Sequence, residues 1–228
     1  MRALLVLLAL LAFPTDEAEA CSCTQRSYAQ HAKDAKQVLL ARAGKPETKG
    51  DALKQTFTVL ATLKGTPTKT FLFDRPATPP CASKYEENEV AILFTHGGDL
   101  DPCHGNWSLE GQIGDLDKIL DATGKKRTDA KAPAVEAALR EALAKYTHGR
   151  SPIRIRHAPL AGRSFQIGTS TLEYTKKAYK GEIRITKAFA ADSIAVVEGT
   201  YNIEGLRFTV LLQGSSTWSV IWSSVTER

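Results

Sequence analysis

Apolar and polar residues alternate in short stretches along the first half of the chain. The clearest stretch covers residues 56–63, where apolar side chains occupy every second position. A period of two over eight residues predicts a strand with one buried face. Shorter apolar runs bounded by glycine, proline and lysine predict further strands at residues 38–43, 71–73 and 90–94. Regularly spaced short strands favour a small β barrel or sandwich over residues 21–121.

Helical spacing marks a few other segments. A turn or two of helix is expected near residues 25–33, and a second short helix at residues 113–120. Val135, Leu139 and Leu143 recur every four residues and predict a longer amphipathic helix. It begins beside Pro133 and ends by Gly149.

Strands follow this helix. Candidates are residues 153–155, 165–167, 183–185 and 194–197, and the clearest pair is a hairpin of residues 206–212 and 218–222. One helix on an antiparallel sheet predicts a small α+β domain over residues 133–228. Its order of elements resembles cystatin or NTF2-type folds. Trp218 and Trp222 would then share one strand face, either as core or as the lining of a cone-shaped cavity.

Residues 122–132 separate the two halves. They contain no large apolar residue and carry three consecutive basic residues. We therefore expect an exposed linker there, with the two halves folding independently and trypsin cutting between them.

The first 20 residues have the pattern of an export signal. Eleven apolar residues at positions 3–13 follow Met1 and Arg2, and Ala18-Glu19-Ala20 matches an A-x-A cleavage site. As a helix the apolar run is only about 16 Å long, too short to span a bilayer, and no later segment is long and apolar enough. We expect a secreted or periplasmic protein that begins at Cys21. Lipidation of Cys21 is the alternative, although Ala18 and Glu19 suit that signal poorly.

Composition indicates a globular protein, because 43% of residues are hydrophobic and 24% are charged. Without the signal the net charge rises from +5 to +7, and residues 133–228 carry thirteen basic and eight acidic residues. An exported protein of this charge is not expected to bind nucleic acid. An acidic glycan or lipid headgroup is a candidate ligand for a basic patch, and a solvated sheet face is the alternative. The patch comprises Arg150, Arg154, Arg156 and Arg163.

Four cysteines lie in the first half: Cys21, Cys23, Cys81 and Cys103. An even number in an exported protein favours two disulfides over a metal site. Bonding Cys21 to Cys23 would close too tight a ring, so the residues alone leave two pairings open.

The C-x-C at the expected new N-terminus, with Cys81 after a Pro-rich segment and Cys103 after the strand at 90–94, resembles the netrin-module family. The best-known members are the tissue inhibitors of metalloproteinases. The resemblance covers residues 21–120. It implies a five-stranded OB-like barrel with Cys21 paired to Cys81 and Cys23 paired to Cys103.

The same resemblance implies a mechanism by which the protein would inhibit a secreted metalloprotease. The free α-amino group and the carbonyl of Cys21 would chelate the catalytic zinc of a secreted metalloprotease, so the protein needs no metal or cofactor of its own. Ser22 would enter the specificity pocket of the protease. Thr78, Pro79 and Pro80 would extend the contact edge.

Two other functional classes are alternatives to inhibition. A secreted binding or structural protein without inhibitory activity would use its basic C-terminal half. An enzyme is not expected, because G-x-S-x-G, H-E-x-x-H and phosphate-loop motifs are missing from the sequence. The group of His96, Asp99, Asp101 and His104 is expected to be a polar loop rather than a metal site. His31, His148 and His157 are isolated and are expected at the surface.

Overall fold

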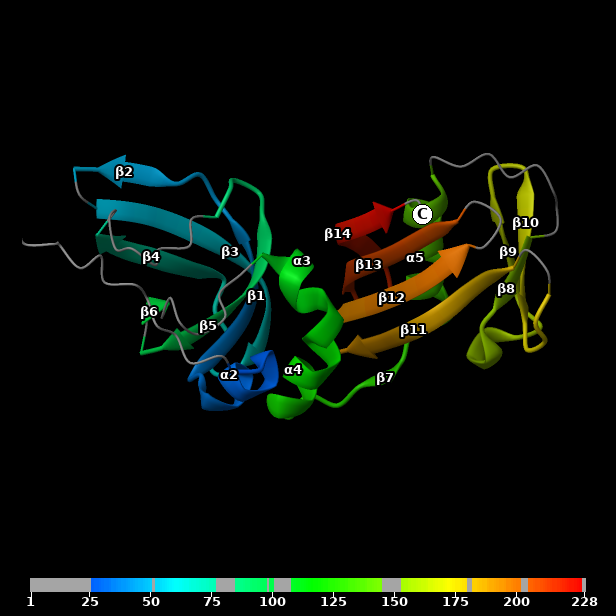
Figure 1. Cartoon of the computed structure of the whole chain (residues 1–228), viewed down its shortest axis with the longest axis horizontal. Helices are drawn as coiled ribbons and strands as arrows, with labels where there is room; N and C mark the ends of the chain where they lie inside the picture. Colours follow the sequence, from blue (N-terminus) through cyan, green and yellow to red (C-terminus); the bar gives the residue numbers. More distant parts are fainter. Residues whose placement is uncertain are drawn as a thin grey trace, which may run out of the picture.

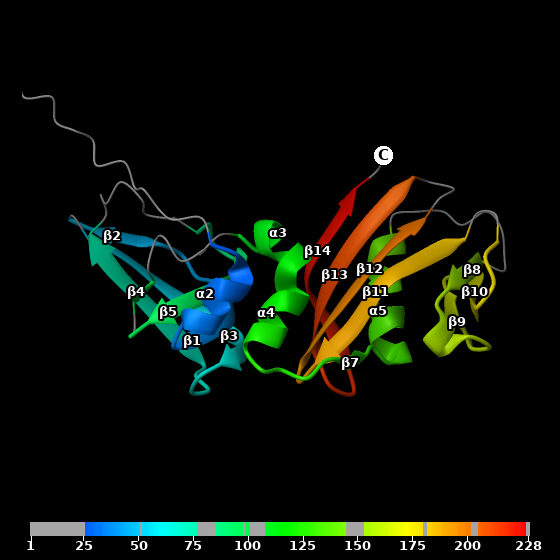
Figure 2. The same ribbon diagram turned by 60° about the horizontal axis from the view of Figure 1, so that its bottom comes forward.

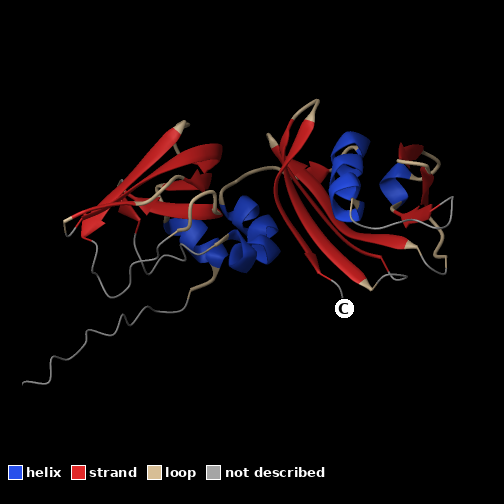
Figure 3. Ribbon diagram, turned by 90° about the horizontal axis from the view of Figure 1, so that it is seen from above, coloured by secondary structure: helices blue, strands red, loops and turns tan. Residues whose placement is uncertain are grey.

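The structure, a computed structural model, describes residues 26–50, 52–76, 85–97, 99–100, 108–144, 153–179, 182–201 and 205–226. It consists mostly of strands in two curled sheets, which we call sheet A and sheet B, with short helices between them (Figure 1). Seen from above, one helix lies in the hollow of sheet B, and the helices of the first half of the chain lie against its opposite face (Figure 3). The expectation of a barrel-like, β-rich protein with few helices is confirmed.

Sheet A is antiparallel throughout the part of the chain that is described. Its strands are β1 (Gln37–Ala43), β2 (Glu47–Lys49), β3 (Ala52–Lys64), β4 (Thr70–Pro76), β5 (Val90–His96) and β6 (Asp99–Leu100). β1 and β2 pair with successive parts of β3, and β4 pairs with β3 as well. β5 pairs with β1, and β6 pairs with β5. Because β6 comes within 8 Å of β4, measured between Cα atoms, the sheet curls toward closure.

The alternation predicted for β3 holds only in part. Leu53, Gln55 and Phe57 are buried and the residues between them are exposed, but residues 59–62 are partly buried on both faces. The second face is covered there because Leu60 and Ala61 pack against the apolar cluster that includes residues of sheet B, and the Gln213 amide of that sheet donates a hydrogen bond to the Leu60 carbonyl. Contact with sheet B therefore interrupts the period of two.

Short helices cover the outer side of β1 and β5. α2 (Tyr28–Asp34) begins at Ser27, whose hydroxyl accepts a hydrogen bond from the Gln30 amide at 3.2 Å. α3 (Leu109–Gln112) continues through the 3-10 turn η1 (Ile113–Asp115) into α4 (Leu116–Ala122). The buried Gln112 side chain bonds both backbone groups of Ile92, at 2.9 and 3.0 Å, and so fixes this helical run to β5.

Sheet B carries the second half of the chain. Its strands are β7 (Thr128–Asp129), β8 (Ile153–Arg156), β9 (Ser164–Ile167), β10 (Ser170–Thr175), β11 (Ile183–Ala191), β12 (Ile194–Tyr201), β13 (Leu206–Gly214) and β14 (Trp218–Thr226). The order is β14-β13-β12-β11-β8-β10-β9, with β7 paired to β11. The predicted antiparallel sheet is wrong in one respect, because β8 runs parallel to both β10 and β11. The 3-10 turn η2 (Ala158–Leu160) and β9 form the crossover that a parallel pairing requires.

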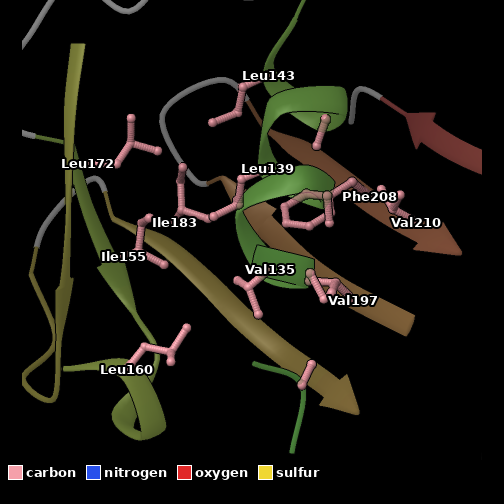
Figure 4. Packing of buried hydrophobic residues seen from close by; sticks show 14 of the residues in the cluster. Val135, Leu139, Leu143, Ile155, Leu160, Leu172, Ile183, Val197, Phe208 and Val210 are labelled. Atoms are coloured by element: carbon pink, nitrogen blue, oxygen red, sulfur yellow. The ribbon is translucent and has the colours of Figure 1, made fainter. Parts of the chain in front are cut away.

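α5 (Ala132–Leu143) lies in the hollow of sheet B (Figure 4). Val135, Leu139 and Leu143 are fully buried or nearly so, as their spacing predicts, and belong to one cluster with Val197 and Phe208 of the sheet.

The two tryptophans of β14 lie on opposite faces, so the expectation of a shared face is wrong. Trp218 packs against the cluster around α5, whereas Trp222 packs toward sheet A. A bulge opposite Leu211 and Leu212 inserts Ile221 as an extra residue, and this reverses the alternation.

One apolar cluster joins the two sheets, and we call it the junction. In it, buried side chains from the helices and strands of the first half pack against side chains of sheet B, among them Phe189, Val196 and Leu211. α2 and α4 stand between the sheets in a second view (Figure 2). Arg42 of β1 also donates a hydrogen bond to the Ile221 carbonyl at 3.2 Å.

The segment 122–132 is largely exposed, as expected, but it is attached to sheet B. β7 pairs with Phe189 and Ala190 of β11, and Ala130 is buried. Lys125 forms an ion pair with Asp192 at 2.6 Å. Short-range sequence patterns could not reveal this, because the partners lie about 60 residues away. The domain boundary itself stays a prediction.

Candidate functional site

The residues expected to meet a protease, and the cysteines expected to form the two disulfides, lie outside the described residues. These are Cys21, Ser22, Cys23, Thr78, Pro79, Pro80, Cys81 and Cys103. Their predicted roles stay predictions, and only the described chain on either side of them can be examined.

The chain on either side of residues 77–84 is anchored in sheet A. Pro76 pairs with Ala52 at the end of β4. Tyr85 is buried and meets the Phe57 ring edge-on, with 5.3 Å between ring centroids. The Gln55 amide also donates to the Tyr85 carbonyl at 2.9 Å. A strand end and a buried aromatic side chain therefore fix the two ends of this segment.

The beginning of α2 lies beside the beginning of the α3–η1–α4 run. A Cβ added at Gly111 would lie 3.7 Å from the Tyr28 hydroxyl. Ser108, just before α3, forms a bridge with Ala91 of β5. The chain that follows Cys23 and the chain that follows Cys103 therefore come together over the outer side of β5.

The predicted polar loop is only partly described. His96 is partly buried at the end of β5, whereas Asp101 and His104 lie outside the described residues, as does the side chain of Asp99. Among the residues whose placement is given, no three His, Cys, Asp or Glu side chains could hold one metal ion.

Two histidines expected at the surface are buried. His31 is 4% exposed and His157 is 9% exposed. The His157 ring lies 6.3 Å from the Tyr174 ring in the core beneath η2. Burial lowers the pKa of His157, and the Asp129 carboxylate offsets this only in part. A single histidine carries no periodic pattern, so its burial could not be predicted. His148 lies outside the described residues.

The basic patch predicted on the second half is divided by the structure. Arg154 and Arg156 share a face of β8, as expected. The guanidinium of Arg154 lies 4.0 Å from the centre of the Tyr179 ring. Arg156 pairs at 2.9 Å with Glu182, whose side chain is only 4% exposed. Arg163 lies in the turn before β9, and Arg150 lies outside the described residues.

Two further arginines lie near this patch that the sequence pattern does not indicate. Arg184 of β11 is the register partner of Arg156. Thr200 of β12 is the register partner of both Arg184 and Arg207, and Arg207 belongs to β13. Alternation within each strand gives the face of each residue, but the order of strands in the sheet was needed to bring them together.

A small polar hollow of about 260 Å³ lies at one end of sheet A, lined by Lys36, Gln37, Gly65, Thr66, Thr95 and Gly97. A Cβ at Gly65 would lie 2.8 Å from the Lys36 carbonyl oxygen, and φ is +89° there, so glycine is required. The hollow is smaller than an ordinary ligand pocket.

No described helix is long and apolar enough to cross a membrane. No protein-family model matches this chain, and comparison with curated proteins finds no relative.

Proposed function

We propose that the protein is an exported, netrin-type binding module, cut after Ala20, that inhibits a secreted zinc metalloprotease through Cys21. The observation that carries the proposal is the strand order of sheet A. β1 and β2 both pair along β3 and can be taken as one bent first strand, which makes β3, β4, β5 and β6 the second to fifth strands. The order across the sheet is then β4, β3, β1 with β2, β5 and β6, and β6 lies close to β4. A curled five-stranded antiparallel sheet of this order is what an OB-like barrel requires.

The positions of the described chain ends support the pairing of Cys23 with Cys103. Cys23 lies five residues before Tyr28, and Cys103 lies five residues before Ser108. An extended chain spans at most about 3.6 Å per residue. Since Tyr28 and Gly111 are neighbours, both cysteines are within reach of each other. A disulfide there would fix the new N-terminus against a rigid sheet, as an inhibitory wedge needs.

The chemistry of the proposed contact follows from an unblocked N-terminus. An α-amino group has a pKa near 8, so its neutral form is accessible at physiological pH. The amine and carbonyl of Cys21 would occupy the open position of the target zinc and displace the attacking water. Ser22 would enter the adjoining specificity pocket, and residues 78–80 would lie along the same edge. The zinc belongs to the protease.

The test compares three forms of the protein against a panel of secreted zinc proteases. One form begins at Cys21, one carries an extra alanine before Cys21, and a control carries an extra alanine after Arg228. The added N-terminal residue converts the amine into an amide, a poor zinc ligand, and pushes bulk into the metal site. We expect inhibition by the first and third forms and at least a hundred-fold loss in the second.

Two results would count against the proposal. If the correctly processed form inhibits none of the proteases, inhibition is excluded for that panel. The second class, a binding or structural protein that acts through the basic half, would then be favoured. If both processed and extended forms inhibit equally, chelation is wrong even though inhibition occurs.

A further inference from the structure

One face of sheet B carries arginines on neighbouring strands. Arg156 of β8 pairs in register with Arg184 of β11, Arg184 with Thr200 of β12, and Thr200 with Arg207 of β13. Register partners on adjacent strands point to the same face. Three strand spacings place the Cα atoms of Arg156 and Arg207 about 14 Å apart. We call Arg156, Arg184, Thr200 and Arg207, with Thr226 beside them on β14, the arginine row.

The arginine row and the junction occupy opposite ends of the same face. Along β12, Ile194 and Val196 are buried in the junction, whereas Thr200 near the other end is only partly buried. The opposite face of these strands is covered by α5, with Ile183 and Phe208 in the core. The row is therefore the open continuation of a face whose other end is already buried.

The charges of the row are not balanced within the described residues. Arg184 and Arg207 are exposed and form no ion pair with any of them. Arg156 is neutralised by the buried Glu182. Arg154, two residues earlier on the same face, lies over the Tyr179 ring and is the register partner of Glu173 on β10, so its charge is also offset. In the next row toward the junction, by contrast, Lys187 and Glu198 pair at 3.6 Å.

Arg184 and Arg207 do not stabilise the described part of the molecule through a charged interaction. Neither side chain makes a hydrogen bond, an ion pair or a ring contact there. Arg156, the register partner of Arg184, is already neutralised by Glu182. The guanidinium groups of Arg184 and Arg207 are therefore available to an external anion.

The side chains around the arginines favour a sugar polymer over a membrane. Hydroxyl residues share this face: Thr200, Thr209, Ser224 and Thr226. They can exchange hydrogen bonds with sugar hydroxyls, while each guanidinium can bind an anionic ester with two parallel hydrogen bonds. A peripheral membrane surface would need large apolar side chains to enter the lipid, and the described residues of these two rows include none.

We propose that the arginine row binds a linear polysaccharide carrying sulfate esters. Arg184 and Arg207 contact the sulfate groups, and the hydroxyl residues contact the sugar rings. This site is separate from the one proposed for Cys21, so either can fail without the other.

The experiment measures binding of the full mature protein to heparin, a linear sulfated polysaccharide, at 0.15 M salt. The double variant Arg184→Gln/Arg207→Gln should bind at least roughly ten-fold more weakly and depend less steeply on salt, because charged hydrogen bonds are the strongest lost contacts. The thermal midpoint of the variant should change little, because neither side chain makes a hydrogen bond or an ion pair within the described residues. Lys45→Gln/Lys49→Gln is the matched control, since it removes the same charge from exposed positions near β2. Arg163→Gln tests a basic residue that is off the row.

Each outcome decides the proposal. Loss of heparin binding in the double variant alone, with both controls unchanged, supports it. Equal loss in the lysine control shows that only net charge matters and overturns the proposal. Binding to phosphatidylglycerol vesicles or to a DNA duplex without binding to heparin assigns the row to another ligand and overturns it as well. Inhibition of a protease should not change in any of these variants.

Discussion

Leu211 offers a test of whether the two sheets form one cooperative unit. It is fully buried in the junction, between Val196 of β12 and Trp222 of β14. Leu211→Ala removes buried methyl groups and leaves a cavity, which costs about 3 kcal/mol within a usual range of about 2–5. In a protein of this size that loss lowers the thermal midpoint by roughly 6–12 °C.

The informative observation is made in the other sheet. Ile92 of β5 lies in the same cluster as Leu211, although β5 belongs to sheet A. If the junction is a shared core, Leu211→Ala should speed amide hydrogen exchange in β5 by about a hundred-fold, in proportion to the lost stability. Calorimetry should show one transition for both forms. Leu72→Ala is the control, because Leu72 is 58% exposed and its truncation should change stability little.

The shared-core account is refuted if exchange in β5 is unaffected while exchange in β12 and β13 increases. Two calorimetric transitions, of which only one moves, would refute it too. Those results would instead support the sequence-based expectation of two halves that fold independently and are separated by trypsin.

Three further predictions concern single groups. Burial lowers the pKa of His157 below its ordinary value of 6.5, so the unfolded chain binds the proton more readily. The contribution of His157 to the free energy of unfolding should therefore be complete above about pH 6.5 and decrease as the pH drops below it. In urea titrations, His157→Gln should flatten this pH dependence. Burial opposes ionisation of Asp117, but the Lys187 ammonium at 3.3 Å, together with the Lys118 backbone amide and Arg127, outweighs it and holds the pKa low. Asp117→Asn should therefore cost about 0.5–1 kcal/mol at pH 7 and less below pH 4. A Cβ at Gly199 would lie 2.8 Å from the Arg184 carbonyl oxygen and 2.5 Å from the Phe208 ring; Gly199→Ala should cost about 1–3 kcal/mol in thermal unfolding.

Each of these has its own contrary result. A pH dependence that is unchanged in His157→Gln would show that another group causes it. If Asp117→Asn is equally destabilising at pH 3 and pH 7, the loss is not one of charge. Gly114→Ala is the control for Gly199, because a Cβ at Gly114 meets no atom within 4 Å, and equal effects at both positions would contradict the steric explanation.

Local periodicity predicted most of the elements that have a regular apolar pattern. β3, β5, α5 and the β13–β14 hairpin are present where alternation or helical spacing placed them. β7 was missed because its two residues are polar and pair with a strand about 60 residues away. The face of Trp222 was also missed, because one inserted residue in a bulged strand moves every later side chain to the other face.

The two candidate sites differ in how much of each could be predicted from the sequence alone. The cysteine positions and the predicted export signal are local features, and both led to the hypothesis on Cys21 without any knowledge of the fold. The arginine row depends on which strands are neighbours in the sheet, and no local pattern in the sequence indicates that order. Arg154 and Arg156 were found because they lie two residues apart on one strand, whereas Arg184 and Arg207 required the sheet.

Whether Cys21 reaches the zinc of a target can be decided by optical spectroscopy of an inhibited protease in which Co²⁺ replaces Zn²⁺. Direct coordination by the Cys21 amine changes the ligands of the metal and therefore its visible absorption spectrum. The account predicts that the form beginning at Cys21 alters the cobalt spectrum and saturates at one molecule per protease, whereas the form with an added alanine leaves the spectrum unchanged. An unchanged spectrum at concentrations where the processed protein fully inhibits the enzyme would contradict it.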